Sequence, residues 1–503
     1  MIFFEEYRTS MTAKAPARIL GVFSLVMINV IAVDSLRTLS FAAIFGLSLV
    51  FYYVIAGICF FIPTALVTAE LATAWPRQGG IYAWVEEAFG AKWGLFTVWL
   101  QWVYNIVWYP TILVFILNLL GDIFKRPVFA KEIAGLQSLV PHLNLTDFAS
   151  SPAFVAGCVT VLFMLLTLLN ARGMALSALV STVCSLVGTL LPMMLITLAG
   201  FMWWYLGYPV NVDFSFHHLL PQLNQLSDLS VFSVILFGLV GLEMSAVHAQ
   251  EVKDPSRDYP RALMISVGVI LVSLAASSLA VAMILTPEEL QAGIIIAPVL
   301  ALNKFLGQVL GQQAAQYAWL AELPFMLGAA AVIVGTLGMV AAWIIGPSKG
   351  LLAAATQGQL PKWFAKTDRS GVPVNILILQ CVIVACLSLV YVLMPSVNAA
   401  YFILTELTAT MALLMYLMFF SSYLVLHFKK AETNRPFRIP GGAVGASITA
   451  CLGICSAFLV MAFSFMLPTQ VQGISAEHYA LLMLVGLILL CSPPLFLCRF
   501  YRA

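Results

Sequence analysis

Three acidic residues lie inside long apolar stretches of the sequence, namely Asp34, Glu243 and Glu406. An ionisable side chain is costly in the hydrocarbon core of a membrane, so it usually serves a function there. Arg37 follows Asp34 by three residues, and an unbroken helix would bring the two to one face as an internal ion pair. The alternative is that the polar cluster around Asp34 interrupts the helix at mid-membrane depth.

Interrupted helices would offer main-chain chemistry inside a membrane. Free amide groups at a helix N-terminus attract a carboxylate, whereas free carbonyl groups attract an ammonium. The run from Phe237 to Glu243 repeats the theme, because Gly238 and Gly241 stand three residues apart before an acid. Such glycines are also typical of closely packed membrane helices, which is the alternative interpretation. Two interruptions would create a pocket suited to a zwitterion.

Aromatic and amide side chains crowd the third apolar stretch. Asn105 and Tyr109 stand four residues apart, so they share one helix face, and a mid-span Asn favours the protein interior. We expect this face to contact a solute, although aromatic side chains more commonly anchor helices at the membrane interface. Trp343 in the eighth stretch is open to both interpretations, as part of the solute path or as an interfacial anchor.

The composition of the whole chain indicates where these residues must work. Of the 503 residues, 62% are hydrophobic and only 9% are charged, and the mean hydropathy is +1.00. A soluble domain carries about 25% charged residues, so a soluble enzyme is excluded. The net charge of +2 disfavours a nucleic-acid partner. The nine cysteines follow no disulfide or zinc spacing, and no phosphate loop of the Walker type is present. We predict no metal and no cofactor.

Twelve apolar stretches are long enough to cross a bilayer as helices, which takes about 20 residues. The predicted fold is therefore an all-α membrane protein with 12 transmembrane helices. The stretches cover residues 19–42, 45–73, 93–120, 153–170, 175–207, 229–250, 260–285, 321–346, 373–394, 399–427, 443–466 and 479–498.

Basic residues indicate the orientation, because the cytoplasmic loops of membrane proteins are rich in Lys and Arg. With a cytoplasmic N-terminus, 19 of the 24 Lys and Arg residues fall inside, 4 fall outside, and Arg37 falls within the first stretch. We therefore expect both termini to be cytoplasmic, including a tail at 1–18, and external loops at 121–152, 208–228 and 286–318.

Four motifs follow the apolar stretches at characteristic intervals. They are AELATAWPRQGGIYAWV at 69–85, GLEMSAVHAQEVKDPSRDYPRA at 241–262, GPSKGLLAAATQGQLPKWFAK at 346–366 and NRPFRIPGG at 434–442. With these motifs the sequence resembles the amino acid–polyamine–organocation (APC) transporters, and among them the bacterial glutamate/GABA antiporter group. The resemblance runs from about residue 19 to the end of the chain.

The resemblance implies a LeuT-like fold of two inverted five-helix repeats, at 19–208 and 229–427, with two peripheral helices at 443–499. It implies a binding site between spans 1, 3, 6, 8 and 10 and transport by alternating access. By position, it places the helix breaks near Ala32–Ser35 and Gly238–Gly241 and puts Trp343 on the substrate path. Leu239 and Met339 stand where the glutamate/GABA antiporters have an aromatic and an acid, so the resemblance does not name the amino acid.

We therefore predict a secondary active amino acid transporter, not an enzyme. It would be an antiporter of the bacterial inner membrane, a monomer or homodimer with the lipid bilayer and an amino acid as its partners. Amides of Val33–Ser35 would hold the substrate carboxylate, and carbonyls of Phe237–Val240 would hold its ammonium. The predicted substrate-binding residues are Ala32, Val33, Asp34, Ser35, Asn105, Tyr109, Phe237, Gly238, Val240, Gly241, Trp343 and Glu406.

Coupling and gating are assigned to Glu243, Arg37 and His248. Glu243 is either a titrating acid that makes transport proton-linked or pH-regulated, or a hinge held permanently by hydrogen bonds. The rival prediction is a carrier of cationic amino acids or polyamines, with Asp34, Glu243 and Glu406 facing the cation. Arg37 opposes that rival, because its positive charge would cancel one of the acids.

Overall fold

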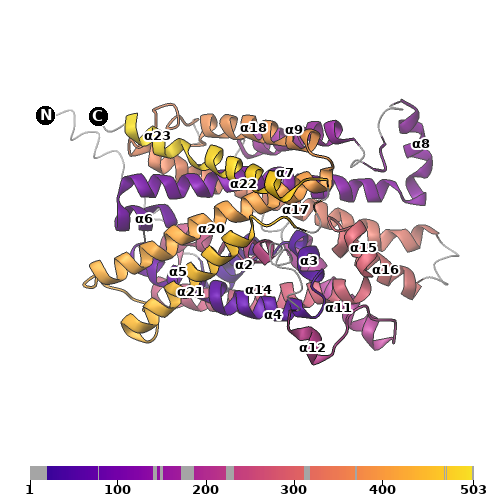
Figure 1. The fold of residues 1–503 in the computed structure, drawn as a ribbon, viewed down its shortest axis with the longest axis horizontal. Coiled ribbons are helices and arrows are strands. Elements are labelled where there is room, and N and C mark those ends of the chain that lie inside the picture. The colour runs from indigo at the N-terminus through magenta and orange to yellow at the C-terminus, as the bar shows by residue number, and fades with distance from the viewer. Residues whose placement is uncertain are drawn as a thin grey trace.

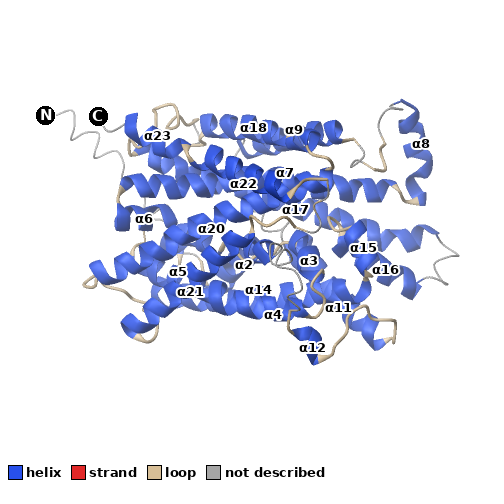
Figure 2. Cartoon of the chain, in the orientation of Figure 1, coloured by secondary structure: helices blue, strands red, loops and turns tan. Residues whose placement is uncertain are grey.

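Helices make up all the regular structure of the described chain (Figure 2). The computed structural model describes residues 20–76, 79–139, 144–147, 151–171, 186–221, 232–310, 318–368, 371–468, 471 and 473–500. Within these residues, ten helices are long and apolar enough to cross a membrane, and one bent pair supplies an eleventh span. The all-α membrane fold expected from the sequence is therefore confirmed.

The spans follow the predicted stretches closely, because continuous apolar sequence is what a bilayer selects. In chain order they are α2 (Val22–Val33) with α3 (Leu36–Ala43); α4 (Ser48–Ala56), η1 (Gly57–Phe61) and α5 (Ile62–Ala74) as one span; α7 (Ala91–Phe124); α9 (Pro152–Ala171); η4 (Leu186–Leu190) with α11 (Leu191–Tyr205); α14 (Pro255–Ile284); α17 (Ala318–Thr356); α18 (Val374–Ser388) with α19 (Val390–Leu393); α20 (Val397–Lys429); α21 (Gly442–Phe463); and α22 (Ala476–Cys491) with α23 (Pro493–Phe500).

The predicted sixth stretch, 229–250, differs from the others. It contains a short helix, α13 (Phe232–Phe237), and a 3-10 helix, η6 (Leu242–Glu251), separated by a non-helical segment. Neither piece alone is long enough to cross a bilayer, which is why the described chain has fewer full spans than the twelve apolar stretches. The remaining helices are short connections: α6 (Ile81–Phe89), η2 (Pro127–Phe129), α8 (Ala130–Leu139), α12 (Phe216–Leu219), α15 (Pro287–Ala292) and α16 (Ala297–Leu310).

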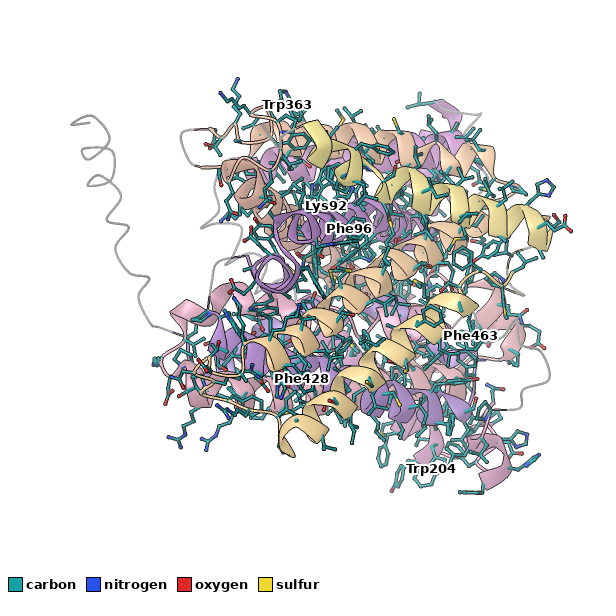
Figure 3. All side chains as sticks on the ribbon, turned by 60° about the vertical axis from the view of Figure 1, so that its left-hand side comes forward. Lys92, Phe96, Trp204, Trp363, Phe428 and Phe463 are labelled. Atoms are coloured by element: carbon teal, nitrogen blue, oxygen red, sulfur yellow. The ribbon has the colours of Figure 1, made fainter. Side chains whose placement is uncertain are left out.

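The spans lie side by side along the long axis of the molecule, with α7, α17 and α20 packed together in the interior (Figure 1). α7 is the most enclosed of the spans, since almost every residue from Gly94 to Leu117 is buried. The outer helices instead present large apolar side chains, and Figure 3 shows Trp204 projecting from the surface. So extensive an apolar exterior requires lipid around it.

The loops are sorted to the two ends of the helix bundle. In Figure 1, α6 lies at one end, whereas α8, α12, α15 and α16 lie at the other. The only β-type pairing in the described chain is an isolated bridge between Leu20 and Val252. There the Lys253 N–H donates to the Leu20 carbonyl at 3.0 Å, so the segment before α2 is joined to the segment after η6.

A buried ion pair fastens three segments at the α6 end. The Glu70 carboxylate of α5 is 1% exposed and accepts hydrogen bonds from Arg435 at 2.7 Å and from the Tyr423 hydroxyl of α20 at 2.9 Å. The N–H of Ile439 donates to the same carboxylate at 2.9 Å. Arg435 also donates to the carbonyls of Leu426 and two further residues, which holds the segment after α20 against the helix ends.

Replacing Arg435 by Met should lower stability strongly, because it leaves the Glu70 carboxylate buried without a cation. The expected loss is about 3–5 kcal/mol, measured as a lower melting temperature of the purified protein in detergent. The matched control is Lys430→Met, which removes a partly exposed partner of Glu87 and should cost about 0–1 kcal/mol. Equal shifts in the two variants would contradict this role of the buried pair.

Candidate functional site

The first span is broken at mid-length. The axes of α2 and α3 differ by 58°, and the two residues between them, Asp34 and Ser35, have extended backbones. The Ser35 carbonyl accepts from both the hydroxyl of Thr38, at 2.8 Å, and its N–H, at 3.2 Å. The first amides of α3 have no acceptor within their own helix, as at any helix N-terminus. The structure thus agrees with the interrupted helix.

The prediction of an internal ion pair between Asp34 and Arg37 is wrong. Asp34 accepts a hydrogen bond from Ser273 of α14 at 3.0 Å, whereas Arg37 donates to Thr111 of α7 and Thr405 of α20. The spacing of three residues brings side chains together only on a continuous helix. Because α3 begins at Leu36, the two charges point to different helices.

The sixth predicted stretch is broken at the same place in the molecule. The backbone leaves the helix after Phe237 and resumes at Leu242, and Gly241 has a φ of +129°, which side-chain-bearing residues rarely adopt. A Cβ on Gly238 would lie 3.2 Å from Thr38 Cγ2, and a Cβ on Gly241 would lie 3.1 Å from the Ala32 carbonyl oxygen. The glycines therefore mark both a break and a close approach, so the two alternatives from the sequence hold together.

A small cavity of about 40 Å³ lies where the two breaks meet α7 and α17. Nine of the predicted site residues line it: Ala32, Val33, Ser35, Arg37, Asn105, Phe237, Gly238, Val240 and Trp343. Four further residues complete the lining and were not among the predicted set: Thr38, Tyr104, Trp108 and Met339. One of these positions carries a usable signal, because Trp108 stands three residues after Asn105 on the continuous helix α7.

Several predicted residues lie behind the cavity rather than on its wall. Tyr109 donates to the Trp343 carbonyl at 2.8 Å and packs against the Phe163 ring, so it positions α17 from outside the lining. Glu406 is fully buried and accepts a hydrogen bond from the Ser233 hydroxyl of α13.

Asp34 and Gly241 are also absent from the lining. The side chain of His248 falls outside the described residues.

Glu243 forms hydrogen bonds that hold the second break in place. One carboxylate oxygen accepts from the Gly241 N–H at 3.2 Å and also from the Tyr416 hydroxyl of α20. The same N–H donates to the Tyr416 oxygen at 3.2 Å. These bonds hold the irregular segment to α20. Glu243 lies outside the cavity lining.

Arg37 is the only charged side chain that lines the cavity in the described chain. It is 2% exposed, and one terminal nitrogen donates to Thr111 at 2.9 Å and to Thr405 at 3.2 Å. The guanidinium carbon lies 5.9 Å from the ring centres of both Phe237 and Tyr401. Its Nε has no hydrogen-bond partner, and no acid of the described chain lies within ion-pair distance. A buried guanidinium in this state is prepared to bind an anion.

The fold and the site together define a membrane transporter. A cavity framed by two broken helices among long apolar spans is the arrangement by which carriers bind small polar solutes. No group of three His, Cys, Asp or Glu residues that could hold a metal ion occurs in the described part of the chain.

The chain belongs to the amino acid permease family, whose model matches residues 19–489. It is therefore an APC superfamily transporter and not an enzyme, which confirms the resemblance found in its motifs. The sequence is 43% identical over 481 residues to an uncharacterized transporter of Legionella pneumophila, covering 95% of this chain and 96% of that protein.

Two more distant relatives are named antiporters. A glutamate/gamma-aminobutyrate antiporter of Lactococcus lactis is 28% identical over 457 residues, with 89% of this chain and 84% of the relative covered. A probable agmatine/putrescine antiporter of the same species is 23% identical over 408 residues, with 79% and 78% covered.

Replacing Gly241 by Ala should impair transport while the protein still folds. The added methyl would force a strained φ and meet the Ala32 carbonyl at 3.1 Å, at a cost of about 1–3 kcal/mol concentrated where the two breaks touch. Amino acid uptake into proteoliposomes should fall at least severalfold. The control is Gly268→Ala in α14, where a Cβ meets nothing within 4 Å. Normal uptake by Gly241→Ala would show that this contact is dispensable.

Proposed function

We propose that the protein is an amino acid antiporter that works by alternating access. In this proposal the apolar stretches form 12 spans, arranged as inverted repeats at 19–208 and 229–427 with peripheral helices at 443–499. The observation that carries the proposal is the meeting of two broken helices around one cavity. Each break falls in the first span of its five-span set, as inverted repeats require. The membrane is a bacterial inner membrane, and both termini are cytoplasmic.

Helix polarity orients the substrate in the cavity. The N-terminus of α3 presents a positive end beside Ser35, and the C-terminus of α13 presents a negative end beside Gly238. The substrate carboxylate binds amides at the break. The Ser35 N–H and the first amides of α3 are the better donors, because the Asp34 N–H already donates to the Val30 carbonyl at 2.8 Å. The ammonium binds carbonyls of the segment after Phe237. The Phe237 carbonyl already accepts from the Val240 N–H at 3.1 Å, so the carbonyls after it are the better acceptors.

The position of Arg37 favours one of the two substrate classes left open by the sequence, namely amino acids over polyamines and cationic amino acids. Polyamines and cationic amino acids need negative charge around them, but Asp34, Glu243 and Glu406 all lie outside the cavity lining. The lining instead presents one guanidinium to the solute. This charge favours amino acids with an additional carboxylate and opposes the cationic alternative, although one relative is named an agmatine/putrescine antiporter.

Glu243 fits the hinge role better than the role of a pH sensor. Two donors meet one of its carboxylate oxygens, and both belong to the segment that must bend or to α20 beside it. Such bonds set the shape of the break in each conformation. Exchange then follows if the cavity closes readily only around a bound substrate, because an amino acid satisfies the main-chain groups that the breaks expose.

A trans-stimulation panel tests the proposed function. Purified protein in liposomes is loaded with single amino acids or amines, and uptake of one labelled amino acid is followed from outside. Internal acidic or neutral amino acids should accelerate uptake several-fold over empty liposomes, whereas internal putrescine and arginine should not. Uptake that no internal amino acid accelerates would reject exchange, and acceleration by amines alone would favour the cationic carrier.

Replacing Arg37 by Gln should change selectivity more than overall activity. A hydrogen bond to a charged group contributes about 1.5–3 kcal/mol, so competition by acidic amino acids should weaken about 10- to 100-fold. Competition by neutral amino acids should change little, and Arg37→Lys should retain part of the preference. An equal loss for acidic and neutral competitors would assign Arg37 to the fold instead of the substrate.

A further inference from the structure

Asp34 is a buried carboxyl group that the substrate site does not use. Its side chain is 0% exposed and reaches α14 at Ser273, while its chain neighbours Val33 and Ser35 line the cavity. No Lys, Arg or His of the described chain lies within ion-pair distance of Asp34. The acid therefore belongs to the unwound segment between α2 and α3, and its side chain is directed to α14 while both of its chain neighbours line the cavity.

The hydrogens available around Asp34 are too few for a carboxylate. The Ser273 hydroxyl lies 3.0 Å from an Asp34 carboxyl oxygen and also 3.0 Å from the Ile270 carbonyl. A hydroxyl has one hydrogen, so it satisfies only one of these two acceptors. A protonated Asp34 solves this, because the carboxyl then donates to Ser273, which donates to Ile270. The second carboxyl oxygen has no donor at all, which is costly for an ion inside a membrane.

Among the residues that the structure describes, none around Asp34 would neutralise a negative charge. Arg37 of α3 turns to Thr111 and Thr405. Tyr53 of α4 pairs its hydroxyl with Ser278 of α14 at 3.4 Å.

The other ionisable groups on elements next to the junction are engaged elsewhere. Glu243 of η6 is held by Tyr416, and Lys304 of α16 pairs with Glu289. Among its described residues, α14 directs three serine hydroxyls at neighbouring elements: Ser266 pairs with Asn29, Ser273 with Asp34 and Ser278 with Tyr53.

We propose that Asp34 is a proton-binding site whose occupancy is linked to substrate binding, an inference that rests on the proposed exchange function. The proton is held as a carboxyl O–H while the cavity is closed. When the angle between α2 and α3 changes, the hydrogen bond between Asp34 and Ser273 breaks and water reaches the carboxyl group. The carboxyl group then transfers its proton to that water.

The linkage is electrostatic. In the proposed function the substrate carboxylate binds the Ser35 N–H and the first amides of α3, so an ionised Asp34 next to them would repel it, and a bound proton removes that repulsion.

Counterflow of a labelled neutral amino acid between about pH 5 and pH 7 tests the proposal, because its carboxylate stays ionised and its ammonium stays protonated over that range. The wild-type exchange rate should fall as pH rises. Above the midpoint of the pH profile the decrease should approach about tenfold per pH unit, since only the fraction of protein with a protonated Asp34 exchanges. Asp34→Asn is neutral at every pH, so its exchange should stay flat across the range. A pH profile for Asp34→Asn equal to that of the wild type overturns the proposal.

Serine variants of α14 supply matched controls. Ser273→Ala removes the partner of Asp34 and should displace the midpoint of the pH profile. Ser266 lies on the same helix as Ser273, and its hydroxyl pairs with Asn29 of α2 at 3.0 Å. Ser266→Ala should leave the midpoint of the pH profile unchanged. Equal profiles for these two variants would count against the site. Replacing sodium by choline should change nothing, and a requirement for sodium that Asp34→Asn abolishes would identify a metal-cation site instead.

Infrared spectroscopy decides the matter if Asp34→Asn folds but does not exchange. The wild type should show the carbonyl stretch of a protonated buried carboxyl that is lost in Asp34→Asn, shifted in Ser273→Ala and unchanged in Ser266→Ala. Absence of that band overturns the proton site. This measurement needs no transport, so it also separates the two proposals: a protein with the band but without trans-stimulation keeps the proton site and loses the exchange function.

Discussion

Hydrocarbon offers no hydrogen bonds, and this constraint governs the whole molecule. Peptide groups in a membrane must be bonded within a helix or face a cavity. Here α2 and α13 both release the chain at mid-span, and the released segments meet each other. Gly238 and Gly241 permit that meeting, since side chains at either position would press on Thr38 or Ala32. The cavity lies between these two released segments.

Four buried ionisable residues, Asp34, Arg37, Glu243 and Glu406, lie around these breaks, and none of the four pairs with another. Asp34 bonds to α14, Arg37 to α7 and α20, and Glu406 to α13. Glu243 bonds to α20 and to its own break. Each side chain therefore ties an irregular segment, or a helix beside it, to a different neighbour. Arg37 is the only one of these four side chains that lines the cavity, so it brings a positive charge to the wall.

Hydropathy predicted the positions of the spans because a bilayer acts on composition over about 20 residues. It could not give the helix ends, and α17 continues to Thr356 beyond the apolar stretch that ends at 346. Side-chain directions were harder still, because spacing rules assume a continuous helix, and the break at Asp34 removed that assumption for Arg37. On α7, the sequence identified Asn105 but not which side of it faces the cavity. Tyr104 and Trp108 flank it on the lining side, and Tyr109 lies on the other.

The bridge between Leu20 and Val252 has a mechanical consequence. It joins the segment before α2 to the segment after η6, so these two half-spans are connected to each other at this end. Two half-spans connected in this way move together, because a displacement of either one is transmitted to the other through the Lys253–Leu20 hydrogen bond. A change of backbone angle in the segment between Phe237 and Leu242 would therefore displace α2 together with η6.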